Sequence, residues 1–302
     1  MQSIKNQYAY VLKSIKKDKT LKPVYKNLSN KTYIVSGATR GIGYNISKKL
    51  ALNGANVIML GKTIENHPKL DNTIFSAADD INELCKDNKC VPIACDIRNH
   101  SEIDDVINQT KSYFGTINGA VLNASALCLK NTIDQTNKDT MLMSSVNING
   151  TYLMGQKCIQ LMYKNFEPSH LLIIAPPLDM LYDSDWWTNH FYYSMSKFNM
   201  SLMAKFWNKE FYNVAVNTLW PRTTINTAPV KNILGGDEMI NISRTTDIMG
   251  DAALNIFLSN PLICNGKNFI DDEVLTSLDI DLQQYKVNKH VPDKDLMPDF
   301  FC

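Results

Sequence analysis

The chain has 302 residues, 44% of them hydrophobic, with 31 Lys and Arg against 30 Asp and Glu. That length is enough to bury one sizeable core, and a net charge of +1 gives no field to attract nucleic acid or an anionic membrane. No apolar run approaches the roughly 20 residues that cross a bilayer, so we expect no transmembrane segment and no nucleic-acid partner.

The first thirty residues are rich in lysine and contain one acidic residue, Asp18. Apolar residues at near-helical spacing favour a short basic amphipathic helix, and the alternative, which we prefer, is an arm that packs on the domain. A mitochondrial presequence usually carries arginine, and this segment has none. We therefore expect residues 1–30 to be a basic N-terminal extension of a cytoplasmic protein, with a mitochondrial location as the alternative.

From residue 32 onward, strand-like and helix-like segments alternate. The expected strands are short, apolar and partly β-branched, as buried parallel strands are: Thr32–Ser36, Asn56–Leu60, Cys90–Cys95, Gly119–Leu122, Leu171–Ala175 and Val214–Leu219. Helical patterns lie between them, around 42–53, 75–86, 101–114, 136–164, 190–212 and 246–258. This alternation is typical of an α/β fold with a doubly wound parallel sheet in three layers, α/β/α. With no linker or repeat, we expect one domain over 31–302.

A glycine-rich segment follows the first expected strand and opens the first expected helix. Glycines allow a sharp turn and the close approach of a pyrophosphate, and the helix N-terminus offers N–H groups to it. The spacing is G-x-x-x-G-x-G. We expect this segment to bind a dinucleotide through Ser36, Gly37, Thr39, Arg40, Gly41, Ile42 and Gly43.

That spacing after an N-terminal strand resembles the short-chain dehydrogenase/reductase family, and the likeness covers essentially residues 31–302. The resemblance implies a Rossmann-type sheet of about seven parallel strands, an oxidoreductase activity and assembly into a homodimer or homotetramer. Segments such as Gly150–Leu153 and Pro298–Phe301 also resemble one subgroup of that family. Members of the subgroup often carry a further sterol-carrier domain, and we expect this chain to lack it.

The end of the second expected strand bears on the choice of nicotinamide cofactor. An NAD enzyme usually has an acidic residue there to bind the ribose, but this strand runs into Lys62 with no carboxylate before Glu65. Lys62 and Arg40 are cations suited to a 2′-phosphate. We therefore expect NADP(H), with NAD(H) as the alternative. Asp96, just past the third strand, matches the aspartate that contacts adenine in the family.

The cysteines do not predict a metal site. The chain has seven, and Cys85, Cys90 and Cys95 are evenly spaced without forming a Cys-x-x-Cys pair. No histidine follows them at ligand spacing. We expect reduced, mostly structural thiols.

The family's catalytic motif, Y-x-x-x-K, occurs three times here, and position decides among the copies. Tyr44 belongs to the helix directly after the glycine-rich segment, and Tyr285 lies beyond the sheet. Only Tyr193 with Lys197 follows the fifth strand and starts a long helix, where the family keeps its catalytic tyrosine.

Residues four apart share one helix face, so the Lys197 ammonium can reach the Tyr193 phenol and lower its pKa. Tyr193 would then exchange a proton with a carbonyl or alcohol oxygen as general acid or base. The resemblance also gives Lys197 a hydrogen bond to the nicotinamide ribose.

Two asparagines match family positions by resemblance. Asn147 corresponds to the catalytic asparagine that holds a proton-relay water. Asn123 corresponds to the second asparagine of the Asn-Asn-Ala-Gly turn beside the cofactor, whose first asparagine is replaced here by Leu122.

The sequence departs from the family at the end of the fifth strand, where Pro176 stands in place of the catalytic serine. Proline has no donor, and the loss of one oxyanion donor costs about a hundredfold to a thousandfold in rate. Ser184 and Ser194 are near in sequence but not at the matching position. A second departure is Arg222, which stands where the family commonly has the glycine of a Pro-Gly pair. Thr223, the next residue, is a candidate contact for the nicotinamide.

Residues 178–191 and 225–242 are expected to form loops over the nicotinamide. The first of these loops is rich in apolar and aromatic residues. They favour a small apolar or lipid-like carbonyl or alcohol substrate, hence a place in lipid metabolism, and a subunit interface is an equal alternative. The sequence thus predicts an NADP(H)-dependent oxidoreductase. The other function weighed is an NADPH-binding homologue with weak or no turnover, acting as a sensor or partner platform.

Overall fold

The computed structural model describes residues 21, 23–66, 68, 70–85, 90–179 and 189–300. Within these ranges the chain builds one parallel sheet of seven strands in the order β3-β2-β1-β4-β5-β6-β7. The strands are β1 (Thr32–Ser36), β2 (Asn56–Gly61), β3 (Cys90–Ala94), β4 (Gly119–Leu122), β5 (Ser169–Ile174), β6 (Val214–Trp220) and β7 (Asn268–Ile270). The doubly wound Rossmann-type sheet of about seven strands is confirmed.

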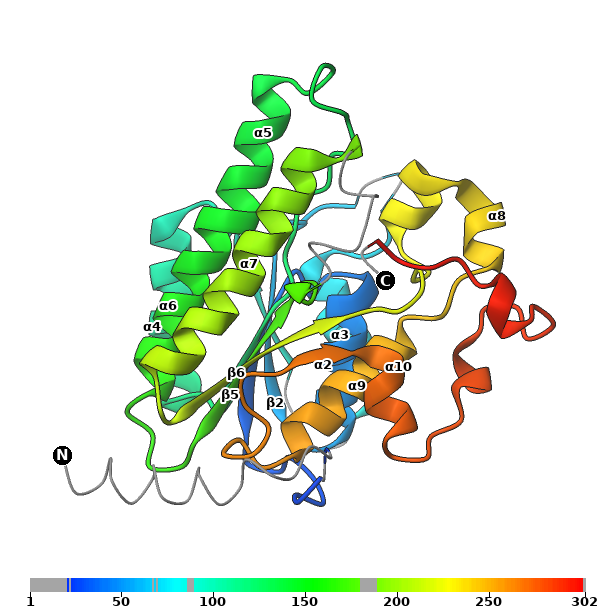
Figure 1. Cartoon of the computed structure of the whole chain (residues 1–302). Helices are drawn as coiled ribbons and strands as arrows, with labels where there is room; N and C mark the ends of the chain where they lie inside the picture. The colour runs from blue at the N-terminus through cyan, green and yellow to red at the C-terminus, as the bar shows by residue number, and fades with distance from the viewer. Residues whose placement is uncertain are drawn as a thin grey trace.

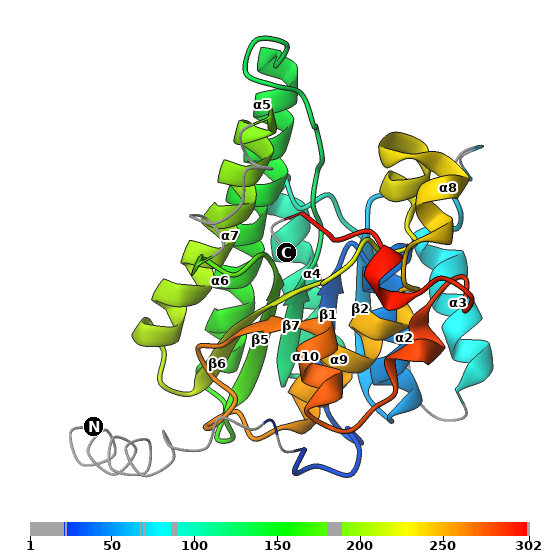
Figure 2. The same cartoon turned by 45° about the vertical axis from the view of Figure 1, so that its right-hand side comes forward.

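Helices cover both faces of the sheet, in three layers (Figure 1). One face carries α4 (His100–Phe114), α6 (Thr151–Met162) and α7 (Phe191–Glu210). The other carries α2 (Gly41–Leu52), α3 (Ile74–Leu84), α9 (Asp247–Leu258) and α10 (Asp271–Thr276). Figure 2, turned by 45°, shows the second group in front of the sheet. None of the described helices is both long and apolar enough to cross a membrane.

The core is divided by the sheet into two clusters, because successive side chains of a strand point to opposite faces. In β1, Val35 faces α2 and α9, whereas Ile34 faces the side of α4 and α6. Both side chains are fully buried. A strand buried on both faces needs apolar residues at every position, which is why these strands have continuous hydrophobic runs.

The long helix expected over 136–164 is interrupted. It begins as α5 (Asn137–Met143), widens into a π-helical segment, η1 (Ser144–Gly150), and continues as α6. The residue before α5, Thr136, caps it by accepting from the Asp139 N–H. Single π-turns inside α-helices occur frequently at functional sites, and this one contains Asn147.

Part of the N-terminal extension packs on the domain, as the arm interpretation expects. The Leu28 side chain is buried, and the Val24 and Tyr25 N–H groups both donate to the carbonyl of Leu258 at the end of α9. Residues 1–20 and 22, where the basic helix was expected, lie outside the described residues.

Residues 225–242, expected as a loop, contain two helical pieces, η4 (Val230–Leu234) and α8 (Gly236–Asn241). In Figure 1 they lie near α2 and α3, on the same side as the carboxyl ends of the strands. The last part of the chain, through η5 (Leu282–Tyr285) and η6 (Asp293–Asp295), returns to that edge (Figures 1 and 2). Neither the short β7 nor this return was predicted from the sequence.

Candidate active site

The glycine loop leaves β1 at the point where the sheet order reverses, between β1 and β4. This is where open α/β sheets bind ligands. Gly37 has φ +66°, and a Cβ there would lie 2.9 Å from the backbone of Ala124. Gly43 has no space for a Cβ either, because the carbonyl of Gly37 lies against it. The glycines are therefore required by the packing of the turn itself.

The mouth of this loop suits an anionic group. Gly41, at φ +60°, begins α2, and a Cβ there would meet only Thr227 within 4 Å. The N-cap residue, Arg40, gives no side-chain cap, and the first turn has no acidic residue. The N–H groups and the positive end of the helix dipole therefore point toward the crevice, as a pyrophosphate would need. The Ile42 side chain packs on the core, so only its backbone can contribute.

Ser36 and Asn123 hold the crevice together. The Ser36 hydroxyl is buried and accepts from the Asn123 and Ala124 N–H groups at 3.0 and 3.1 Å. The Asn123 amide donates to the Ser36 and Gly37 carbonyls at 3.0 and 3.1 Å. Their side chains brace the end of β1 against the end of β4, and cofactor binding by these two residues stays a prediction.

Cations gather where β1, β2 and β3 end. Arg40 donates to the carbonyls of Asp71 and Asn72 at 2.8 and 2.9 Å, so the guanidinium lies over the segment after β2. Lys62 is exposed directly after β2. Thr39, by contrast, is buried, and its hydroxyl lies against Gly61.

Asp96 is engaged by a residue that the sequence analysis missed. The guanidinium of Arg98 pairs with both carboxylate oxygens and holds the pKa of Asp96 below its usual value, and the charge of Lys62 acts in the same direction. The Asp96 N–H donates to Glu102 at 2.7 Å. If Asp96 contacts adenine, its carboxylate is therefore bonded to Arg98 at the same time.

Tyr193 and Lys197 lie one turn apart on α7, and both are buried, with 7% and 2% of their surface exposed. The Lys197 ammonium donates to the carbonyl of Ile174, the last residue of β5, at 2.7 Å. It also lies 5.1 Å from the ring centre of Trp220, the last residue of β6. The pair thus stands at the carboxyl edge of the sheet, unlike Tyr285, whose hydroxyl donates to Asp251.

Burial dominates the ionisation of this pair. It lowers the pKa of Lys197 to about 7, while the charge of Asp299 acts in the opposite direction. Burial raises the pKa of Tyr193 well above its ordinary value, and Asp299 adds to that rise. The expectation that Lys197 would lower the pKa of Tyr193 therefore does not hold in this state, because taking the phenolate out of water costs more.

The side chain of Asn147 is fully engaged by protein groups. Its amide donates to the Ala126 carbonyl and the Ser196 hydroxyl, both at 2.9 Å. Its oxygen accepts from the Ser125 hydroxyl at 3.1 Å and the Ala126 N–H at 2.7 Å. With two donors and two lone pairs used, the side chain has no capacity left for a water. It fixes the turn after β4 to α7, and a catalytic role of Asn147 stays a prediction.

The position after β5 where the family has a serine is occupied here by Pro176. Pro176 follows β5, and its carbonyl accepts from the Ser201 hydroxyl at 2.6 Å. The Ser194 hydroxyl is buried and has no hydrogen-bond partner within the part of the chain that the structure describes. Ser184 lies outside the described residues, as does the apolar segment 180–188.

The loop after β6 carries the other predicted contact. Thr223 is buried, and its hydroxyl has no hydrogen-bond partner among the described residues, which suits a carboxamide of the nicotinamide. Arg222 points away toward α10: its N–H donates to Asp271, and its guanidinium pairs with Asp272 and Glu273. The arginine in place of the family's glycine therefore anchors the loop.

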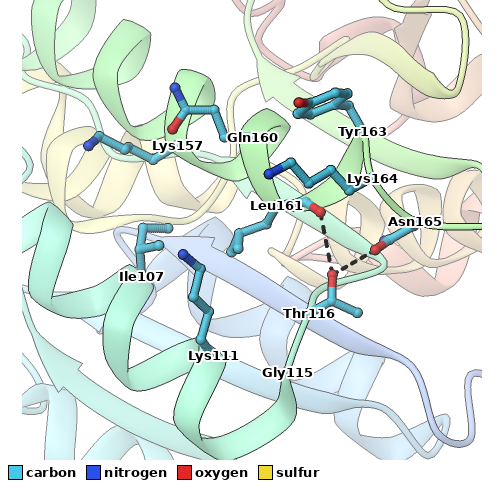
Figure 3. Close-up of a pocket in the computed structure, with 10 residues that line it drawn as sticks. All are labelled: Ile107, Lys111, Gly115, Thr116, Lys157, Gln160, Leu161, Tyr163, Lys164 and Asn165. Atoms are coloured by element: carbon cyan, nitrogen blue, oxygen red, sulfur yellow. Dashed lines mark hydrogen bonds between the residues drawn. The ribbon is translucent and has the colours of Figure 1, made fainter.

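A separate basic cleft of about 520 Å³ lies at the opposite end of the sheet, between the C-terminal parts of α4 and α6 (Figure 3). Lys111, Lys157 and Lys164 line it. Two helices end there, so these cations complement the negative ends of the helix dipoles, and Lys157 also pairs with Asp104. The cleft is remote from the glycine loop.

The sequence profile of the short chain dehydrogenase family matches residues 31–234. The chain is 40% identical over 276 residues to hydroxysteroid dehydrogenase-like protein 2 of Xenopus tropicalis and 37% identical over 275 residues to the human protein of that name. Each alignment covers 91% of this chain and 64% of the relative, so the chain spans less than two thirds of their length.

Among solved structures, a putative dehydrogenase from Xanthomonas campestris has a TM-score of 0.83 at 36% identity, covering 91% of this chain and 99% of that one. A short chain dehydrogenase from Mycobacterium thermoresistibile has 0.81 at 36%, covering 90% and 95%. The profile, the relatives and the solved structures agree with the Rossmann-type fold described above. The chain belongs to the short-chain dehydrogenase/reductase family, whose members are oxidoreductases that bind NAD(P).

Proposed function

We propose that the protein is an NADP(H)-dependent oxidoreductase that interconverts a carbonyl and an alcohol on a small apolar or lipid-like substrate. The observation that carries this proposal is the buried pair of Tyr193 and Lys197 at the carboxyl edge of the sheet. The alternative, a cofactor-binding homologue without turnover, is not favoured, because both members of the pair are present on one face of α7. A cytoplasmic location stays a prediction.

The residues divide the work as follows. The glycine loop and the start of α2 would hold the pyrophosphate, and Thr223 the carboxamide. The nicotinamide, when bound, supplies or accepts the hydride. Tyr193 gives its proton to the substrate oxygen in reduction and takes one in oxidation. Burial raises the pKa of Tyr193, which favours the protonated phenol.

Tyr193→Phe removes the proton donor without changing the shape of the side chain. We expect turnover of apolar ketones with NADPH to fall by about a hundredfold or more, with NADPH affinity kept. The measurements are steady-state kinetics and fluorescence titration of NADPH. Tyr44→Phe, in the incidental copy of the motif, is the control and should keep its activity. Equal, negligible turnover in wild type and mutant, with both binding NADPH, would count against an enzyme.

The preference for NADP(H) over NAD(H) is supported by Arg40, Lys62 and Arg98 at the ends of β1, β2 and β3. The 2′-phosphate would be bound by charge-assisted hydrogen bonds, each contributing about 1.5–3 kcal/mol.

Arg40→Ala should therefore weaken NADPH binding about tenfold or more and leave NADH binding nearly unchanged. Calorimetric titration with each cofactor measures both affinities. Lys111→Ala, in the remote basic cleft, should change neither. An equal loss for the two cofactors would mean that Arg40 acts on the loop rather than on the phosphate.

Pro176 leaves the substrate oxygen without the donor that the family serine supplies. Pro176→Ser should raise turnover by up to about a hundredfold, which is what one oxyanion donor is worth. The local fold should be kept, because the Ser201 hydroxyl bonds to the main-chain carbonyl of residue 176, which does not depend on the proline ring. Pro177→Ser serves as the neighbouring control. Unchanged turnover in Pro176→Ser, with the fold intact by circular dichroism, would show that the site obtains its donor elsewhere.

We further propose a homo-oligomer that uses the outer face of α6 and α7. Tyr152 on α6 and Leu202 and Phe206 on α7 are 44%, 40% and 63% exposed, and members of the family are generally oligomeric. Apolar side chains grouped in this way usually mark an interface.

Phe206→Glu should convert the assembly into monomers, because it would place a charge in that interface. Sedimentation velocity would measure the change. Phe75→Glu on α3, at 44% exposure, should leave the assembly intact. If wild type is itself a monomer at micromolar concentration, this proposal is wrong.

A further inference from the structure

Three neighbouring strands of the sheet, β4, β5 and β6, are each entered from a helix at the edge opposite the candidate active site. The helices are α4, which ends at Phe114, α6, which ends at Met162, and α7, which ends at Glu210, and a short turn leads from each into its strand. Because the strands are parallel, the three turns meet at the amino edge of the sheet. In Figure 1 they lie at the lower end of the molecule, opposite α5.

Hydrogen bonds hold the three turns to one another. The Thr116 hydroxyl donates to the side-chain oxygen of Asn165 at 2.7 Å, and the Asn165 amide donates to the Ile117 carbonyl at 2.6 Å. The Asn213 amide donates to the Tyr163 carbonyl at 2.6 Å. The turns therefore form one connected surface rather than three independent loops.

An aromatic side chain is exposed at each turn. Phe166, between α6 and β5, is fully exposed, and both Tyr113 near the end of α4 and Tyr212 before β6 are more than half exposed. Single exposed apolar residues are ordinary, but rings grouped on adjoining turns mark a contact with a partner or a membrane. The amino edge of the sheet thus has the composition of a contact surface.

Lysines accompany these rings. Lys111 and Lys164 line the basic cleft between α4 and α6, as Figure 3 shows, and Lys209 lies in the last turn of α7. The third lysine of the cleft, Lys157, pairs with Asp104, whereas the other two cleft lysines are in no ion pair of the described residues. The nearly neutral net charge of the whole chain therefore conceals a local excess of positive charge.

The acidic side chains of this edge do not reverse that sign. Glu167, next to Phe166, pairs with Lys31. Glu210 follows Lys209 directly in the sequence, so these two adjacent charges offset each other. The two cleft lysines without an ion pair therefore set the sign of the charge beside the exposed rings.

We propose that this surface, formed by Lys111, Tyr113, Lys164, Phe166 and Tyr212 and called here the amino-edge surface, docks on an anionic lipid bilayer. Lysines are attracted to anionic headgroups, and aromatic rings enter the boundary between headgroups and acyl chains. A second copy of the chain fits less well, because a symmetric contact would place the same lysines of both copies against one another.

This proposal does not rest on the proposed function. The candidate active site lies at the carboxyl edge of the sheet, so a chain docked through its amino edge would keep that site open to water. Lipid binding and turnover can therefore be measured separately, and the failure of one leaves the other in place.

The test uses the full chain and vesicles of equal parts phosphatidylcholine and phosphatidylserine, with binding measured by co-sedimentation at low salt. Phe166→Ser should weaken binding about tenfold, because it removes one apolar ring from the boundary. Lys111→Gln/Lys164→Gln should weaken it about twentyfold, because each lysine near an anionic surface contributes about fivefold. Vesicles of phosphatidylcholine alone should bind little protein, and added salt should release the bound protein.

Matched controls come from the opposite end of the molecule. Ile133→Ser removes an apolar side chain that is almost fully exposed in the segment before α5. Lys138→Gln/Lys231→Gln removes two exposed lysines, one in α5 and one in η4. Both controls should bind the vesicles as wild type does, with the fold of every variant checked by circular dichroism.

Four results would overturn the proposal. The first is a wild-type chain that does not bind the anionic vesicles at low salt. The second is undiminished binding by the Phe166 and lysine variants, which would assign lipid binding to another basic segment, such as residues 1–20. The third is a loss of self-association in Phe166→Ser without lipid, which would make the surface a contact between copies. The fourth is stronger release by inorganic phosphate than by chloride at equal ionic strength, which would identify a small-anion site in the cleft.

Discussion

A parallel sheet brings the carboxyl ends of all its strands to one edge, and every part of the candidate site depends on that constraint. The glycine loop follows β1, the turn with Asn123 follows β4, Lys197 bonds to the end of β5, and Trp220 ends β6. These segments are far apart in sequence and meet because the strands are parallel. The reversal of strand order between β1 and β4 opens the crevice, and Ser36 and Asn123 keep its two sides at a fixed separation.

A second constraint is that burial at that edge disfavours the charged forms of the side chains placed there. Tyr193 and Lys197 are placed where water is excluded, which strengthens any electrostatic contact and makes each ionised form costly. A neutral carbonyl and an indole take up part of that cost for the lysine. The C-terminal segment reaches the same edge through the Trp220 N–H, which donates to the carbonyl of Phe300.

Much of the fold could be predicted because buried parallel strands are apolar at every position and helices repeat at 3.6 residues. The site was predicted where it is local in sequence, as in the glycine loop, or where order along the chain decides, as for Tyr193. What could not be predicted depends on contacts between distant segments. Nothing in the sequence around Asn147 indicates that Ser125 and Ser196 take up its side chain, and nothing near Trp220 indicates that its ring lies beside Lys197. Arg98, two residues past Asp96, was within reach of sequence reasoning, since an acid and a base so spaced can pair.

The π-helical segment, η1, has a consequence for how this part of the protein can vary in length. A residue of an α-helix turns the chain by about 100°, and a residue of the wider π-helix turns it by less. Losing one residue between Ser144 and Gly150 would rotate everything before the deletion relative to α6. Asn147, which ties the turn after β4 to α7 through four hydrogen bonds, would then point elsewhere. A single-residue deletion in this stretch should therefore disturb the site more than a substitution at Asn149, its one exposed position.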